Sequence, residues 1–117
     1  MIRYLVLATS LVLFAAPAAA ANVECKNAVT QMDMNFCADK DYQAADKKLN
    51  EAYRKAAAQE DAHGRDLLKQ SERAWMTYRD AQCTYQTNAS EGGSIQPMEY
   101  SECLTEKTKA RIKELQS

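Results

Sequence analysis

The sequence predicts an all-α protein: a small antiparallel helical hairpin or three-helix bundle stapled by two disulfides. The 117 residues include only three glycines and two prolines, so few positions interrupt a helix. Apolar residues recur at steps of three and four, and no useful stretch alternates as a strand does. Four cysteines, an even number, follow an N-terminal segment that resembles an export signal.

That N-terminal segment has the three-part layout of a secretory signal peptide. Arg3 supplies a basic start, an apolar run extends from Leu5 to Ala16, and Pro17 precedes a stretch of alanines ending at Ala20. The apolar run is shorter than the roughly 20 residues that a membrane span needs. We therefore expect cleavage of residues 1–20 and a protein of the periplasm or the secreted fraction, not held in the membrane once the signal is removed.

The remaining residues, 21–117, are enough for one small domain. Only one of the 15 basic residues, Arg3, lies in the signal, so 14 basic residues face 16 acidic ones and the net charge becomes −2. Charges of both signs are spread along the chain. Nucleic acid is disfavoured as a partner because binding to phosphates requires clustered positive charge.

The first predicted helix follows Thr30, which with Asp33 resembles a capping box. The stretch from Val23 to Ala62 lacks Gly and Pro, and Gly64 is expected to end the helix in a left-handed conformation. Whether the helix continues through residues 38–41 stays open. One stripe carries the apolar or aromatic residues Met34, Ala38, Tyr42, Ala45, Leu49, Ala52, Tyr53 and Ala56.

The second helix is predicted from about Arg65 to Thr87. Its expected inner stripe comprises Leu67, Leu68, Ser71, Ala74, Trp75, Tyr78, Ala81, Gln82 and Tyr85. A loop over residues 88–96 centres on two adjacent glycines. Pro97 suits the first turn of a third helix, which is expected to run to about Leu115.

The cysteines Cys25, Cys37, Cys83 and Cys103 are expected to form two disulfides. A helical hairpin turning near His63 brings all four to one end of the bundle, so all three pairings remain open. Pairing of Cys25 with Cys37 and of Cys83 with Cys103 is favoured because each closes a short connection. We expect no metal or cofactor, because there is no Cys-x-x-Cys and His63 is the only histidine.

Several blocks of the sequence resemble a known family. They are Thr30-Gln31 with Met34-Asn35 and Cys37-Ala38; Ala45-Asp46 with Leu49-Asn50 and Tyr53; Arg73-Ala74-Trp75 with Tyr78-Arg79-Asp80 and Cys83; and Gly92-Gly93-Ser94 with Cys103-Leu104, Thr108 and Arg111. Together they resemble the LprI-like family of small secreted bacterial domains, named for a lysozyme inhibitor. The resemblance extends from about Cys25 to Leu115, and it departs at Glu72, where family members often carry Gln. It implies a helical fold, an envelope location and inhibition of a lysozyme.

We expect a binding protein and not an enzyme, because the one histidine lies in an expected turn and the cysteines are expected to be oxidised, so the usual nucleophilic sets are missing. The candidate partner-binding residues are the loop residues Glu91, Gly92, Gly93 and Ser94, together with Arg79 and Asp80. Arg79 has a competing structural interpretation, in which it pairs with Asp46 or Glu51 on the facing helix. The hypothesis is a lysozyme-inhibitor-like protein that blocks a muramidase cleft; the alternative is a structural or adaptor protein of the envelope. The sequence sets no oligomeric state.

Overall fold

The computed structural model describes residues 13–14 and 23–117, so the predicted signal peptide, residues 1–20, lies almost wholly outside the described residues. Three helices form the molecule: α1 (Gln31–Ala58), α2 (Ala62–Gln86) and α3 (Gln96–Gln116). Two 3-10 turns flank them, η1 (Cys25–Asn27) and η2 (Asn88–Ser90). The all-α class is confirmed, with no strand in these ranges. No helix in the same ranges is long and apolar enough to cross a membrane.

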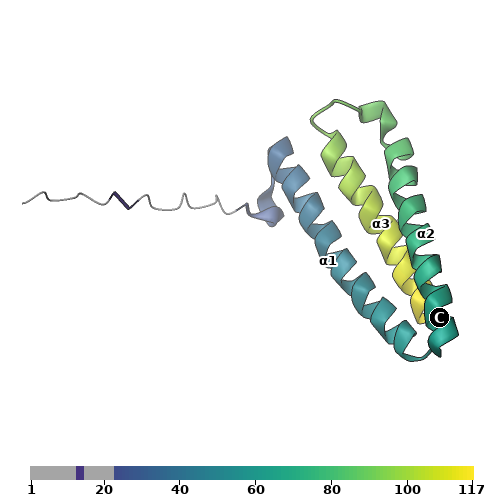
Figure 1. The fold of residues 1–117 in the computed structure, drawn as a ribbon. Coiled ribbons are helices and arrows are strands. Elements are labelled where there is room, and N and C mark those ends of the chain that lie inside the picture. The colour runs from purple at the N-terminus through teal and green to yellow at the C-terminus, as the bar shows by residue number, and fades with distance from the viewer. Residues whose placement is uncertain (1–12, 15–22) are drawn as a thin grey trace, which may run out of the picture.

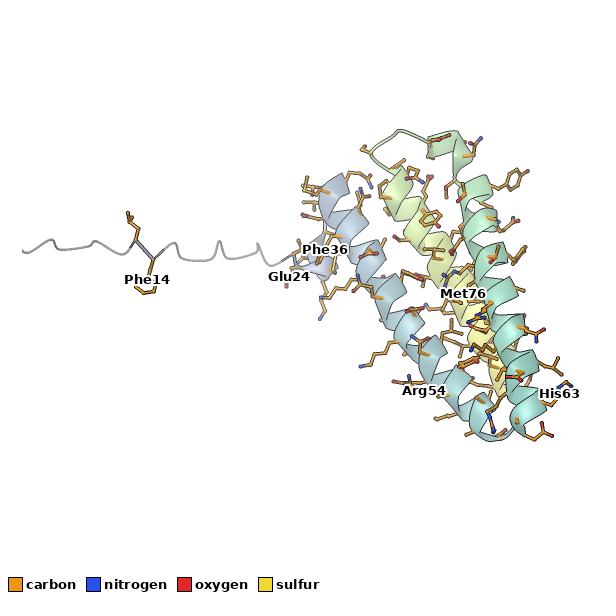
Figure 2. The ribbon with its side chains drawn as sticks, in the orientation of Figure 1. Phe14, Glu24, Phe36, Arg54, His63 and Met76 are labelled. Carbon is orange, nitrogen blue, oxygen red and sulfur yellow. A yellow bond between two sulfur atoms is a disulfide. The ribbon has the colours of Figure 1, made fainter. Side chains whose placement is uncertain are left out.

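The three helices run up and down in chain order, so α1 and α3 are parallel and α2 is antiparallel to both (Figure 1). The α2–α3 connection and the start of α1 lie at one end of the bundle, which we call the tip. The α1–α2 turn and the C-terminus lie at the other end, the base (Figure 1). His63 lies at the base, far from the α2–α3 connection (Figure 2).

Helix α1 is one continuous helix of 28 residues, which settles the question left open at residues 38–41. It begins as predicted: the Thr30 side chain accepts a hydrogen bond from the backbone N–H of Asp33 at 3.1 Å. The predicted inner stripe is confirmed at its centre, where Ala38, Ala45, Leu49 and Ala52 are buried. The three alanines recur every seven residues and let the backbones approach closely, so α1 packs mainly against α3.

The predicted role of Gly64 is wrong. Helix α2 already begins at Ala62, because Asp61 serves as its N-cap and accepts a hydrogen bond from the Gly64 N–H at 2.7 Å. Gly64 thus lies in the first turn of α2, and among the described residues Gly92 is the one with a positive φ. Helix α1 ends instead at Ala58, where the N–H of Gln59 bonds back to the carbonyl of Ala56.

The predicted inner stripe of α2 is only partly correct. The buried residues of α2 are Glu72, Arg79 and Cys83, with Trp75, Leu68 and Gln82 half-buried beside them. The rest of the predicted stripe is exposed: Leu67, Ser71, Ala74, Tyr78, Ala81 and Tyr85. The expectation failed because a buried ionic network occupies the inner face of α2, whereas the prediction rested on apolar character alone.

Helix α2 stands further from α1 than α3 does, and a groove of about 220 Å³ lies between α1 and α2. Its walls are Asp46, Leu49, Asn50 and Tyr53 from α1 and Lys69, Glu72, Arg73 and Met76 from α2. Large polar side chains thus keep the two helices apart, while small alanines draw α1 and α3 together.

Candidate protein-binding tip

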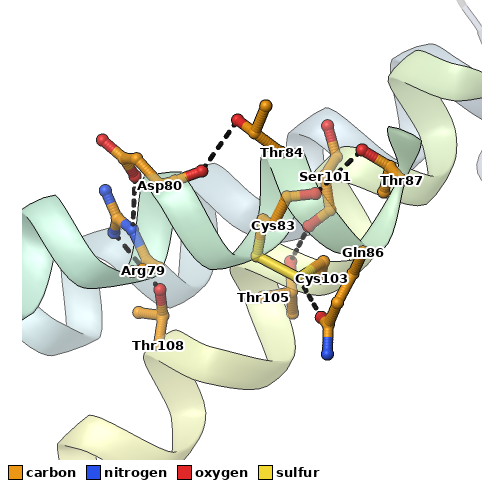
Figure 3. Close-up of a disulfide and its surroundings, with 10 residues drawn as sticks. All are labelled: Arg79, Asp80, Cys83, Thr84, Gln86, Thr87, Ser101, Cys103, Thr105 and Thr108. Carbon is orange, nitrogen blue, oxygen red and sulfur yellow. Dashed lines mark hydrogen bonds and ion pairs between the residues drawn. A yellow bond between two sulfur atoms is a disulfide. The ribbon is translucent and has the colours of Figure 1, made fainter. Parts of the chain in front are cut away.

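Two disulfides fix the tip. Cys25 is bonded to Cys37, which holds the η1 turn against α1, and Cys83 is bonded to Cys103, which joins the end of α2 to the start of α3. These are the two pairings that the sequence favoured. Cys83 is fully buried, and the hydroxyl of Thr87 donates to its carbonyl at 2.8 Å where α2 ends (Figure 3).

The connection between α2 and α3 is held in one conformation by its own backbone. The N–H of Gly93 donates to the carbonyl of Ser90 at 2.9 Å, and the N–H of Gln96 donates to the carbonyl of Gly93 at 3.3 Å. Gly92 has a φ of 79°, a left-handed conformation that side chains disfavour. A Cβ on Gly93 would meet the Ser90 carbonyl at 3.1 Å. Glycine is therefore suited to both positions for steric reasons.

Side chains from outside the connection tie it to both neighbouring helices. The amide of Asn35 on α1 donates to the carbonyl of Ser94 at 2.9 Å, and the amide of Gln31 donates to the Asn35 side-chain oxygen at 2.8 Å. The hydroxyl of Ser90 donates to the carboxylate of Glu99 on α3. Asn35 thus joins the start of α1 to the loop.

The predicted loop residues Glu91, Gly92, Gly93 and Ser94 are all exposed at the tip. Apolar side chains are exposed next to them. Ile95 follows Ser94 directly and is 39% exposed, and Met32, one turn before Asn35 on α1, is 80% exposed. The tip therefore combines a polar loop held by hydrogen bonds with exposed apolar side chains.

Arg79 lies apart from this loop, inside the bundle. Its side chain is 7% exposed, and its guanidinium lies 5.4 Å from the ring centre of Tyr42 and 5.0 Å from that of Trp75. Its Nε donates to Asp80 at 2.9 Å, and a second nitrogen donates to the hydroxyl of Thr108 at 3.4 Å (Figure 3). This is the packing of a core residue, although its ionic partner is Asp80 and not Asp46 or Glu51.

A second ion pair, in which both side chains are only 11% exposed, extends this cluster. Arg111 donates to Glu72 at 3.0 Å and to Ser71 at 3.0 Å, and lies 5.8 Å from the Trp75 ring centre. The sequence analysis did not predict this pair, because Arg111 lies 39 residues beyond Glu72 and no local pattern links the two. Arg111 is three residues beyond Thr108, which is fully buried, and this spacing indicates the same face.

Within the Arg79–Asp80 pair, only Asp80 is accessible to a partner, because its side chain is 54% exposed. Arg79 and Asp80 are therefore not brought together with Glu91–Ser94 into one site. Across the part of the chain that the structure describes, no three His, Cys, Asp or Glu side chains gather as a metal site would require.

The fold and the tip define a class: a small three-helix domain, crosslinked at one end, with a rigid exposed loop suited to contacting another macromolecule. The chain belongs to the family described as lysozyme inhibitor LprI, whose model matches residues 24–115. An uncharacterized protein of Rhizobium meliloti (strain 1021) is 43% identical over 105 residues, covering 79% of this chain and 76% of that protein. No solved structure matches the chain.

Proposed function

We propose that this protein is an inhibitor of a muramidase in the bacterial envelope and that it acts by covering the enzyme's cleft with its tip. Membership of the lysozyme inhibitor family supports the class of target. The rigid loop is the single observation that supports the mode of action. Because its conformation is set before binding, little conformational entropy is lost on association.

The chemistry of the tip suits such a cleft. Glycoside hydrolases use a pair of carboxyl groups beside the scissile bond, and an inhibitor must exclude substrate from them. Ser94 and the exposed amides of the loop supply hydrogen-bond donors for those acids. Met32 and Ile95 supply apolar contact area around the donors. Asp80 belongs to the flank of α2 and contributes at most to the rim of the contact.

We infer export through the predicted signal peptide and a location in the periplasm or outside the cell, where two disulfides form and persist. We also infer that the protein has no catalytic activity of its own. Inhibition by steric blockage requires neither a nucleophile nor a general base.

The decisive test is a cell-wall lysis assay with several types of lysozyme. Ile95→Asp should weaken inhibition of the susceptible lysozyme by about tenfold or more, since burying an unpaired charge in a contact costs more than 1.4 kcal/mol. Met76→Asp is the matched control: Met76 has the same exposure, 39%, but lies midway along α2. Its inhibition should remain within about twofold of the parent protein.

Three outcomes count against the proposal. Absence of inhibition of every lysozyme type at micromolar excess removes the function itself. Equal losses of inhibition in the two variants, or a loss in Met76→Asp alone, would indicate that the lysozyme contacts the α1–α2 groove and not the tip. If no lysozyme is inhibited, the alternative function, an adaptor that binds another envelope protein, replaces the proposed one.

A further inference from the structure

Helix α2 carries an exposed stripe comprising Leu67, Ser71, Ala74, Tyr78, Ala81 and Tyr85, in which Ser71 lies at the edge next to α3 and accepts a hydrogen bond from Arg111. The steps along it are four, three, four, three and four, the spacing of a coiled-coil seam. None of the six side chains is charged. Leu67 is 52% exposed, Tyr78 55% and Tyr85 76%, and no described element covers them.

The distribution of polarity on α2 differs from that of an ordinary surface helix. Its inner face buries an arginine and a glutamate, whereas the outer stripe presents aromatic and aliphatic side chains to solvent. A continuous uncharged seam more than two heptads long is more than the scattered exposure of single apolar residues that is normal on a protein surface. Such a seam has the periodicity needed to pack against another helix.

The seam is complementary to itself in the antiparallel direction. When two copies of α2 are paired about a two-fold axis at the level of residue 76, Ala74 lies opposite Tyr78 of the second copy, and Ser71 lies opposite Ala81. The large Tyr78 thus meets the small Ala74 at the centre, two small residues meet at the next level, and Leu67 meets Tyr85 at each end. No pair places like charges together, because the seam has none.

The exposed area of the stripe is suited to a weak dimer. A buried aromatic side chain contributes about 150–250 Å², so the exposed parts of the seam amount to roughly 450 Å² per copy. The pair then buries about 900 Å², which is clearly less than the roughly 1,200–2,000 Å² of a standard stable interface and lies in the range of weak, transient ones. This predicts an equilibrium between monomer and dimer at micromolar or higher concentration, not an obligate dimer.

We propose that two copies of this protein associate through the outer stripe of α2, antiparallel and about a two-fold axis near residue 76. This inference is independent of the proposed inhibition, because the stripe lies along the side of the bundle and excludes the loop residues 91–95. Antiparallel pairing points the tips of the two copies toward opposite ends of the dimer, so each remains free.

Sedimentation equilibrium of the purified, disulfide-bonded protein tests the association over a concentration series from about 1 µM to 1 mM. The parent protein should shift toward the dimer as concentration rises. Tyr78→Glu should raise the dissociation constant at least tenfold, because two copies of the charge enter one seam. Thr84→Glu is the matched control: it adds the same charge to an exposed α2 position outside the stripe, and the dissociation constant should be unchanged.

The direction of pairing is tested by crosslinking. Ala74→Cys and Tyr78→Cys variants, mixed under mild oxidation, should yield a crosslinked heterodimer in preference to either homodimer; preferential homodimers would indicate parallel pairing and overturn the model. A parent protein that stays monomeric throughout, or a dimer that Tyr78→Glu does not weaken, also overturns it. If Tyr78→Glu abolishes lysozyme inhibition but leaves dimerisation unchanged, the stripe contacts the enzyme and not a second copy.

Discussion

At the scale of single residues, the interior of this small bundle is organised by two arginines. Arg79 is stacked between Tyr42 and Trp75, and Arg111 approaches Trp75 from α3. Guanidinium groups suit this setting because they are planar, weakly hydrated and stack on aromatic rings. The aromatic faces and the carboxylates of Asp80 and Glu72 together compensate for the desolvation of the two cations.

Replacing Arg79 by lysine should therefore destabilise the protein although the charge is kept. A lysine ammonium is not planar and is more strongly hydrated than a guanidinium, so it cannot stack on the two rings, and we expect the free energy of unfolding to fall by about 2–4 kcal/mol. Arg54→Lys is the control: Arg54 is exposed on α1, and the change there should stay within about 0.5 kcal/mol. Urea denaturation measures both, and equal effects would refute the stacking argument.

Tyr42 provides a second residue-level prediction. Burial raises the pKa of its phenol above the ordinary value of 10.0, although the neighbouring Arg79 partly opposes the shift. The folded state thus favours the neutral phenol more than the unfolded state does. The resulting contribution to stability is complete below pH 10 and is lost as the pH rises from there through the folded pKa.

Difference titration isolates this group. Absorbance of the tyrosinate is followed against pH in the parent protein and in Tyr42→Phe, and the difference curve should have its midpoint above pH 10. The Phe variant should also lose less stability than the parent between pH 9 and pH 11. A difference midpoint at or below pH 10 would contradict the burial of this phenol.

At the scale of the helices, alanine sets the distance between α1 and α3. Ala45 is only 4% exposed and lies midway along the seven-residue series of Ala38, Ala45 and Ala52. Ala45→Leu should force the helices apart and lower the free energy of unfolding by about 1–3 kcal/mol. Ala44→Leu, one residue earlier on the exposed side, should have little effect when both are compared by chemical denaturation. A neutral Ala45→Leu would show that α1 and α3 are not closely packed.

The helices themselves could be predicted because their determinants are local. Periodicity, the Thr30 cap, Pro97 and the scarcity of glycine depend on neighbours within a few residues. The face of α2 that is turned inward could not be predicted, because it depends on which side chains of the other two helices contact it. Nothing near Glu72 in the sequence reveals that Arg111, 39 residues later, pairs with it.

The same distinction applies to the candidate site. The exposed glycine loop was predictable from composition, since adjacent glycines between two helices have few other uses. The contact of Asn35 with Ser94 spans 59 residues of sequence and needed the fold. Arg79 was placed among possible contact residues because charge commonly indicates a surface, and only its position between two aromatic rings shows it to be interior.

At the scale of the whole molecule, the two disulfides close loops of similar length, with separations of 12 and 20 residues. Removing either pair by Cys→Ala substitution should cost about 3 kcal/mol of stability. Their effects on inhibition should differ. The Cys83–Cys103 pair anchors both ends of the tip loop, so its removal should weaken inhibition well beyond what removal of Cys25–Cys37 does. Thermal unfolding and the lysis assay on the two double variants test this, and equal inhibition by both would contradict it.

Both covalent bridges lie within the half of the bundle that carries the tip, while the base is closed by side-chain packing and caps alone. The helices are therefore crosslinked near the tip, whereas noncovalent contacts alone hold them together at the base. We therefore expect thermal fraying to start at the base, where no covalent bond joins the helices, and to reach the tip last. An affinity tag or a fluorophore is accordingly best inserted between Gln59 and Glu60, which leaves the Asp61 cap of α2 in place.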